Sequence, residues 1–195
     1  SSGNAVLFGR ATTINAGNGS INIVGCGSAA GVYLNTWNGG AYSITAKGDI
    51  NITGSSSSSG TYDYDFAGIR SYYNDTAQSG TIRSTGGNVT LTGSGVTAGL
   101  FIYSSNNIVA DVGNVTLTGT ASSGNRAIVM YSNVLSGGNE INISTTNNNR
   151  IWLSGTVGQL AGSNVTSTNA NITISGSQLF DGNSPTINTR AGNVT

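Results

Sequence analysis

Charged residues are scarce in this sequence. Only 7% of its 195 residues are Asp, Glu, Lys or Arg, and the seven basic and seven acidic residues cancel to a formal net charge of zero. Ordinary globular chains carry about 25% charged residues. The polar surface of this chain must therefore consist mainly of hydroxyl and amide side chains. Without a basic stripe the chain lacks the electrostatic footprint of a nucleic-acid-binding protein, and we expect no nucleic-acid partner.

Histidine is absent, and cysteine occurs once, as Cys26 between Gly25 and Gly27. A single cysteine excludes a disulfide within the chain, and the lack of histidine excludes a Cys/His zinc site. Cys26 is therefore expected to be a small packed residue rather than a nucleophile. The sequence also lacks an apolar run of membrane-spanning length, so no membrane insertion is expected in this segment.

What the chain has in abundance is glycine, 30 residues of it, together with a repeated motif. GNVTLTG occurs at Gly87–Gly93 and again at Gly113–Gly119. Related segments begin with the apolar residues Ile21, Ile50, Val89, Val115, Ile141, Ile172 and Val194, at spacings of 29, 39, 26, 26, 31 and 22 residues. A repeat of this length is typical of solenoids, propellers and arrays. A constant motif at variable spacing indicates fixed rungs joined by loops of different lengths.

Each copy alternates apolar and polar residues between glycines, which is the period of a half-buried strand. β-Branched residues and glycine dominate, so a helix is excluded. A second strand is predicted after most copies, at residues 31–34, 68–72, 99–103, 127–131 and 150–153. A weaker third strand is predicted at residues 42–45, 81–84, 107–110, 133–135, 164–166 and 186–189.

Three short strands per repeat predict an all-β fold, a right-handed parallel β-helix of roughly six to seven turns. Gly and Asn are expected to supply the positive φ angles of the corners. A β-propeller would need four antiparallel strands per blade and longer repeats. Residues 1–195 are expected to form a single β-helix segment with a loop insertion at 55–66. Because the last copy, Gly192–Thr195, is incomplete and neither end has a polar capping element, we expect a piece of a longer fibre.

The GNVTLTG and GDINITG segments resemble the repeats of filamentous haemagglutinin and related two-partner-secreted adhesins. The resemblance covers most of the chain as a repeat pattern. It implies a long β-helical fibre displayed on the surface of Gram-negative bacteria, and hence a secreted or cell-surface location. The family's NPNL and NPNG secretion motifs are not found here. Autotransporter passengers and other repetitive surface fibres have similar rungs.

Some β-helices are polysaccharide lyases or hydrolases, which need clustered carboxylates in a groove. Here the acidic residues are mostly separated by a turn or more, and only Asp63 and Asp65 lie close in sequence. These two have ligand-like spacing, but a Ca²⁺ site needs six to eight oxygen ligands, so they are weak metal candidates within a solvated loop. We expect no enzyme activity, no cofactor and no metal.

Aromatic side chains recur at the outward positions of the second strand. Stacking of the turns predicts two adjacent columns, one of Tyr33, Phe101 and Trp152 and one of Tyr72, Tyr103 and Tyr131. Exposed aromatic patches mark interaction sites, so this face is the candidate binding face for a glycan or protein receptor, or for neighbouring fibre chains. The alternative is that the rings form ladders that stabilise the β-helix in place, or are covered by the 55–66 insertion.

The first strand carries a different outward column, formed by Thr90, Thr92, Thr116, Thr118 and Thr173 with neighbouring Asn and Ser. A T-x-T face of this kind is similar to that of ice-binding β-solenoids. Irregular repeat spacing, and the pairs Asn22/Val24 and Asn51/Thr53, break the expected array. Ice binding is therefore the minor alternative.

Nine Asn-x-Ser/Thr sequences offer candidate glycosylation sites, at Asn18, Asn51, Asn74, Asn88, Asn114, Asn142, Asn164, Asn171 and Asn193. Most coincide with the repeat motif, which accounts for them without modification. Taken together, the sequence favours an extracellular adhesin segment that presents side-chain columns for host-cell, glycan or cell–cell binding. The alternative is a structural stalk or a filament-forming matrix protein.

Overall fold

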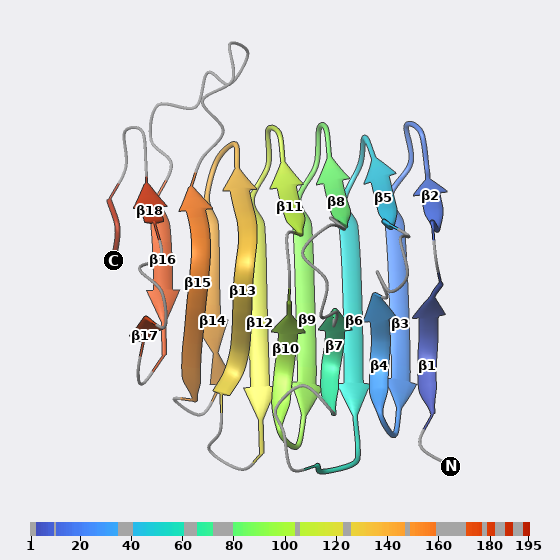
Figure 1. The fold of residues 1–195 in the computed structure, drawn as a ribbon. Helices are drawn as coiled ribbons and strands as arrows, with labels where there is room; N and C mark the ends of the chain where they lie inside the picture. The colour runs from blue at the N-terminus through green and yellow to red at the C-terminus, as the bar shows by residue number, and fades with distance from the viewer. Residues whose placement is uncertain are drawn as a thin grey trace.

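The computed structural model describes residues 3–9, 11–34, 41–60, 66–71, 80–103, 106–122, 126–146, 149–158, 171–176, 179–181, 186–188 and 193–195. The strands are β1 (Asn4–Phe8), β2 (Thr13–Asn15), β3 (Ile21–Gly27), β4 (Ala30–Leu34), β5 (Ser43–Ala46), β6 (Ile50–Ser56), β7 (Ala67–Ser71), β8 (Thr81–Ser84), β9 (Val89–Gly95), β10 (Ala98–Ile102), β11 (Asn107–Ala110), β12 (Val115–Ala121), β13 (Arg126–Gly137), β14 (Ile141–Thr145), β15 (Arg150–Gly158), β16 (Ile172–Ser175), β17 (Leu179–Asp181) and β18 (Thr186–Asn188). All pairings between them are parallel (Figure 1).

The strands stack into two layers. Sheet B consists of β3, β6, β9, β12, β14 and β16, one strand from each successive copy of the motif. Sheet A has two tiers, because β4, β7 and β10 carry the second strand of a turn and β5, β8 and β11 carry the third (Figure 1). β13 and β15 are long enough to span both tiers. The chain is therefore an all-β parallel β-solenoid with about three strands per turn, as the repeat predicts.

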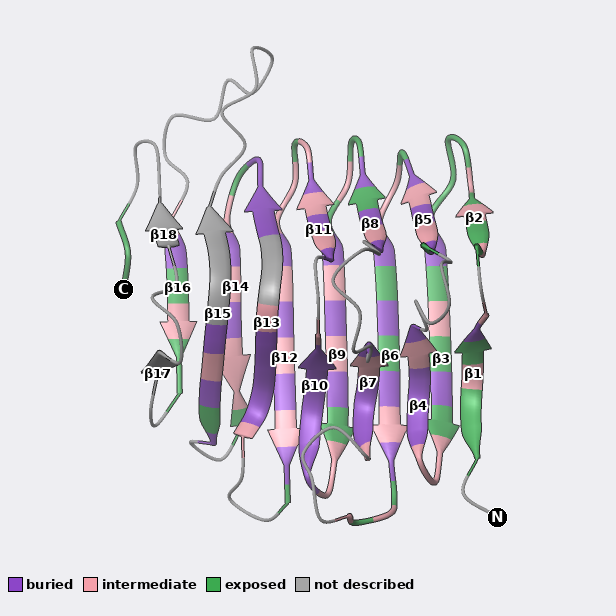
Figure 2. Ribbon diagram, in the orientation of Figure 1, coloured by how far each residue is buried: buried purple, intermediate pink, exposed green. Residues whose placement is uncertain are grey.

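The alternation of apolar and polar residues sets which side chains point inward. Along β9 and β12, buried Val and Leu alternate with accessible Thr, and Figure 2 shows the same banding on β3 and β6. Equivalent inward residues of successive turns pair directly, as in Ile52↔Leu91 and Leu91↔Leu117. Each turn therefore buries its apolar side chains against those of the next turn.

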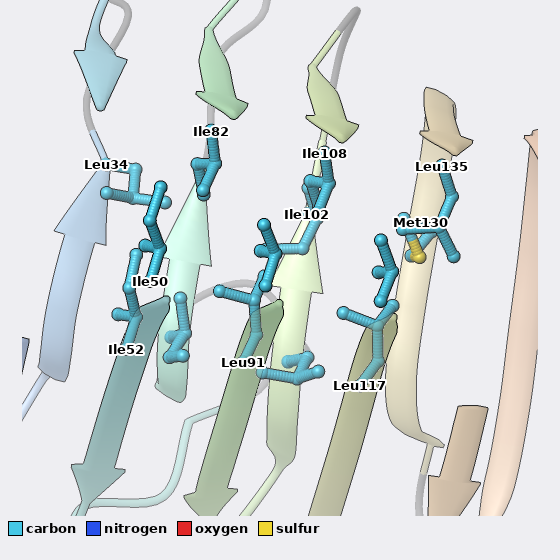
Figure 3. Packing of buried hydrophobic residues seen from close by; sticks show 14 of the residues in the cluster. Leu34, Ile50, Ile52, Ile82, Leu91, Ile102, Ile108, Leu117, Met130 and Leu135 are labelled. Atoms are coloured by element: carbon cyan, nitrogen blue, oxygen red, sulfur yellow. The ribbon is translucent and has the colours of Figure 1, made fainter. Parts of the chain in front are cut away.

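The core lies between the two sheets. Side chains of Ile50, Ile52, Leu91 and Leu117 from sheet B meet Leu34, Ile82, Ile102, Ile108, Met130 and Leu135 from sheet A (Figure 3). Most of these side chains have no exposed surface. Since fully burying one such side chain contributes about 1.5–3 kcal/mol, repeated apolar ladders are the main favourable term in the stability of this solenoid.

A column of glycines brings the sheets together at one corner. Gly25, Gly54, Gly93 and Gly119 occupy the inward position at the end of the motif and pair in register. A Cβ at Gly93 would overlap the carbonyl of Gly99, and Gly25 and Gly54 face Gly31 and Gly68 in the same way. These residues are glycine because two backbones approach closely, not because of their φ angles. In the described part of the chain a positive φ is found only at Gly17 and Ala11. The predicted positive φ at the corners therefore holds at Gly17, in the turn between β2 and β3, and is wrong for the glycine column.

One buried polar cluster interrupts the apolar interior. The Tyr42 hydroxyl donates to Asn106 Oδ1 at 2.8 Å, and Asn106 Nδ2 donates to the Tyr103 carbonyl at 2.7 Å and to Ser71 Oγ at 2.9 Å. The Tyr42 ring occupies the space above Gly80, where any Cβ would clash with it. Burial raises the pKa of the Tyr42 phenol far above its usual value. Tyr42 thus links its own turn to one two turns further along.

Two features of the chain path differ from expectation. Ser55 and Ser56 continue β6, and Ser56 Oγ donates to the carbonyl of Ser28 at 3.0 Å, so the insertion expected at 55–66 begins after them. The third strand expected at 164–166 lies outside the described residues. The C-terminal half of β15 instead occupies the third-strand position of that turn and pairs with both β13 and β18.

Gly93→Ala should destabilise the chain by about 2 kcal/mol or more, because its new methyl group would have to displace backbone atoms rather than a flexible side chain. Denaturant unfolding followed by circular dichroism measures this. Gly9→Ala is the matched control, because a methyl group added at Gly9 would meet no atom within 4 Å; equal stability losses in the two variants would contradict the close-approach explanation.

Candidate functional site: the aromatic cluster and the polar face

The residues of the first predicted aromatic column pair in register from strand to strand on the outward side of sheet A. Tyr33 pairs with Arg70, Arg70 with Phe101, Phe101 with Val129, and Val129 with Trp152. The flanking residues of these strands, such as Leu100 and Ile102, are buried on the inward side. The column therefore contains the three predicted rings, with Arg70 and Val129 between them.

Four rings form a continuous chain of contacts, which we call the aromatic cluster: Phe101, Tyr103, Tyr131 and Trp152. Phe101 and Tyr103 stack with parallel planes and centroids 6.2 Å apart. Tyr131 then contacts Tyr103 at 5.2 Å and Trp152 at 5.8 Å, both in tilted geometry. Such pairs contribute about 0.5–1.5 kcal/mol each beyond the area they bury. The two predicted columns are thus joined by contacts between the rings themselves.

The interior of the cluster is closed to solvent. Phe101 is only 4% exposed and Val129 is fully buried, and both pack with Ala67 and Ala98. Tyr103, Tyr131 and Trp152 are half-buried around them. Of the predicted face, Phe101 therefore serves as a packing residue, and the accessible edge belongs to the other three rings and to Tyr33. Tyr72 lies outside the described residues.

Two arginines lie over aromatic rings on this side of the molecule. The guanidinium carbon of Arg126 is 3.8 Å from the centroid of the Trp152 ring, and that of Arg70 is 4.9 Å from the centroid of Tyr33. A cation over an aromatic face is attracted by the electron density of the ring. One face of the Trp152 indole is therefore occupied by Arg126.

The outward side of sheet B carries columns of small residues that are polar except for the exposed Val24. The strands β3, β6, β9, β12, β14 and β16 place them in register, and we call this surface the polar face. The first column is Asn22, Asn51, Thr90, Thr116, Asn142 and Thr173, and the second is Val24, Thr53, Thr92, Thr118, Ser144 and Ser175. The irregular repeat spacing does not disturb these columns, because the extra residues lie outside sheet B.

A third column, which the sequence reasoning did not identify, runs along the end of the polar face. It consists of Cys26, Ser55, Ser94 and Thr120. The expectation that Cys26 is packed inside is wrong, because its side chain is exposed and its Sγ lies 2.7 Å from Ser55 Oγ. The strand alternation could have revealed this, since Cys26 lies five residues after the inward Ile21 and Ser55 five after Ile50.

A column of side-chain oxygens lines the corner where each turn enters sheet B. Asp49 Oδ1 accepts the backbone N–H of Asn88 at 2.7 Å, Asn88 Oδ1 accepts that of Asn114 at 2.9 Å, and Asn114 Oδ1 accepts that of Glu140 at 3.0 Å. The Asn of GNVTLTG thus satisfies a corner donor of the next turn. This role accounts for the sequons at Asn88 and Asn114. Along this corner Asn88 and Asn114 lie between Asp49 and Glu140, so the two carboxylates are not neighbours.

The remaining charges in the described part of the chain include the ion pair of Arg83 with Asp111. Arg83 donates from Nη2 to Asp111 at 2.8 Å and from Nε to both carboxylate oxygens, and this hydrogen bonding raises the pKa of the Arg83 guanidinium. Among the described residues, no three His, Cys, Asp or Glu side chains lie together in a group that could hold a metal ion. The candidates Asp63 and Asp65 lie outside them. Within the same ranges, no helix is long and apolar enough to cross a membrane.

Comparison with protein-family models, curated proteins and solved structures finds no match to this chain. The β-helical repeat is established by the fold, and the resemblance to haemagglutinin-type adhesins remains a prediction from the motif.

The packing around Trp152 predicts its accessibility. In a Trp37→Phe background, where Trp152 is the sole tryptophan, Arg126→Ala should make the fluorescence of Trp152 more sensitive to acrylamide, because it uncovers one face of the indole. Arg83→Ala is the control, since its guanidinium bonds Asp111. Unchanged quenching in Arg126→Ala would show that Arg126 does not shield the ring.

Proposed function

We propose that this chain is a segment of an extracellular adhesive fibre. The solenoid forms the body of the fibre, and the accessible rings of the aromatic cluster, Tyr103, Tyr131 and Trp152, contact a glycan or protein receptor. The observation that carries the proposal is the continuous contact from Tyr103 through Tyr131 to Trp152, with all three rings half-buried. Rings held in this way lose little conformational freedom on binding.

The composition of this surface is typical of recognition surfaces. Tyr, Trp and Arg are the residues most enriched where binding energy concentrates, and Arg126 adjoins the rings. The partly accessible rings of Tyr103 and Tyr131 combine apolar area with a hydroxyl group, which suits stacking and hydrogen bonding to sugars, whereas Trp152 Nε1 is buried and Trp152 would contribute apolar area. A secreted or cell-surface location follows from the same proposal, because such receptors lie outside the cell.

A glycan-array screen of the chain beside a Tyr103→Ala/Trp152→Ala variant tests the proposal. Selective binding should weaken at least about tenfold, since truncating a central aromatic anchor costs about 2 kcal/mol or more. Thr116→Ala/Thr118→Ala on the polar face is the matched control and should bind as the unsubstituted chain does. Circular dichroism establishes that all three proteins are folded. Selective binding that persists in the aromatic variant would contradict the proposal.

A structural stalk or filament element is the second candidate. The burial of Phe101 and Val129 favours it, because these outward residues pack as a second small core and stabilise the solenoid in place. Lateral association of chains would be seen as concentration-dependent sedimentation that the Tyr103→Ala/Trp152→Ala variant loses. A monomer that binds no glycan would leave the stalk as the better account.

A further inference from the structure

The polar face lacks the features that recognise most ligands. None of its six strands contains a charged residue or an aromatic ring, whereas sheet A carries Arg70, Arg83, Arg126 and Arg150. Its outward side chains are nevertheless all accessible, and Asn51, Thr53 and Thr173 are exposed. Proteins usually hold sugars and small molecules in concave sites with aromatic or charged groups, so this face does not suit them.

What the face does have is two-dimensional regularity. Neighbouring strands of a sheet lie about 4.8 Å apart, and residues i and i+2 on one strand lie about 6.6 Å apart. Six strands pair in register, so the outward side chains occupy a lattice with these two repeats. Thr90, Thr92, Thr116 and Thr118 fill four adjacent points of it.

The lattice is also held rigidly. The β-branched side chain of Thr has few rotamers on a strand, and neighbouring hydroxyls contact one another, as Thr118 Oγ1 with Ser144 Oγ at 3.5 Å and Thr120 Oγ1 with Thr146 Oγ1 at 2.7 Å. Successive turns are kept in register by the glycine column and by the side-chain oxygens of Asp49, Asn88 and Asn114 at the corner where each turn enters sheet B. The side chains therefore need little reorganisation to meet a periodic partner.

A periodic array of groups that each bind weakly is suited to a ligand that is itself periodic, such as a crystal. When the ligand is water itself, a single hydrogen bond gives no net affinity, because a bond to liquid water is exchanged for a bond to ordered water. A protein can therefore distinguish ice from liquid water only with many groups at once. The spacing of these groups must match the crystal, and the groups must be ordered before binding. Charged side chains would oppose this by holding their own hydration shells, and the polar face has none.

We propose that the polar face binds ice, with the Thr methyl and hydroxyl groups of the first two columns as its centre. The structure favours this role more than the sequence does, because the irregular repeat spacing is absorbed outside sheet B and Thr53 lies in register with Thr92. The proposal does not depend on the aromatic cluster, which lies on sheet A.

Thermal hysteresis and partition into a growing ice hemisphere test the proposal on the 195-residue chain. The chain should show hysteresis and enter the ice. Thr92→Lys and Thr118→Lys, made separately, should each reduce hysteresis at least about fivefold, since one long charged side chain lifts the array from a flat crystal. Thr118→Val keeps the branched shape and tests the hydroxyl alone should the Lys variants not fold.

Thr81→Lys is the matched control, because Thr81 points outward from β8 on sheet A and is partly accessible. It should retain the hysteresis and ice partition of the unsubstituted chain. Absence of hysteresis and of ice partition in the folded chain would overturn the proposal. Equal losses in Thr81→Lys and Thr118→Lys would overturn it as well, because the effect would then not belong to the polar face.

Discussion

The close approach of two backbones at one corner of each turn is the constraint on which the rest of this solenoid depends. Gly25, Gly54 and Gly93 stand directly against Gly31, Gly68 and Gly99, with no room for a side chain between them. Because this contact is the same in these turns, the two sheets keep a constant separation and equivalent residues fall into ladders. The columns of the polar face and the outward column of sheet A both follow from this repeated contact, which keeps successive turns in register.

The two sheets use this regularity differently. Sheet B repeats one short polar pattern without charge, so its surface is periodic. Sheet A varies from turn to turn, placing Tyr33, Arg70, Phe101, Val129 and Trp152 in a single column, and its surface is a specific cluster. A periodic surface suits a periodic partner and a specific cluster suits a particular one, so the two proposed interactions would use different sheets of the solenoid.

Polar groups inside and at the corners supply specificity that the apolar ladders lack. Ile and Val ladders would tolerate a slip between equivalent turns, whereas the hydrogen bond from Tyr42 to Asn106 joins two particular residues 64 positions apart. The corner oxygens of Asp49, Asn88 and Asn114 likewise satisfy donors where a strand begins. Breaking the buried bond between Tyr42 and Asn106 leaves a polar group unsatisfied, at a cost of about 1–3 kcal/mol.

Alternation along GNVTLTG was enough to predict the strands and the inward direction of residues such as Val89 and Leu91, because the two-residue period of a strand is local. The repetition of the motif predicted the parallel stacking of the turns. The A-G dipeptide before Val32, Ile69 and Leu100 was visible as well, although its purpose was not. Only the tertiary structure decided that Phe101 and Val129 are covered and that unequal repeats still place Thr53 beside Thr92. Burial and register of this kind are set by neighbours in adjacent turns, which lie dozens of residues away along the chain.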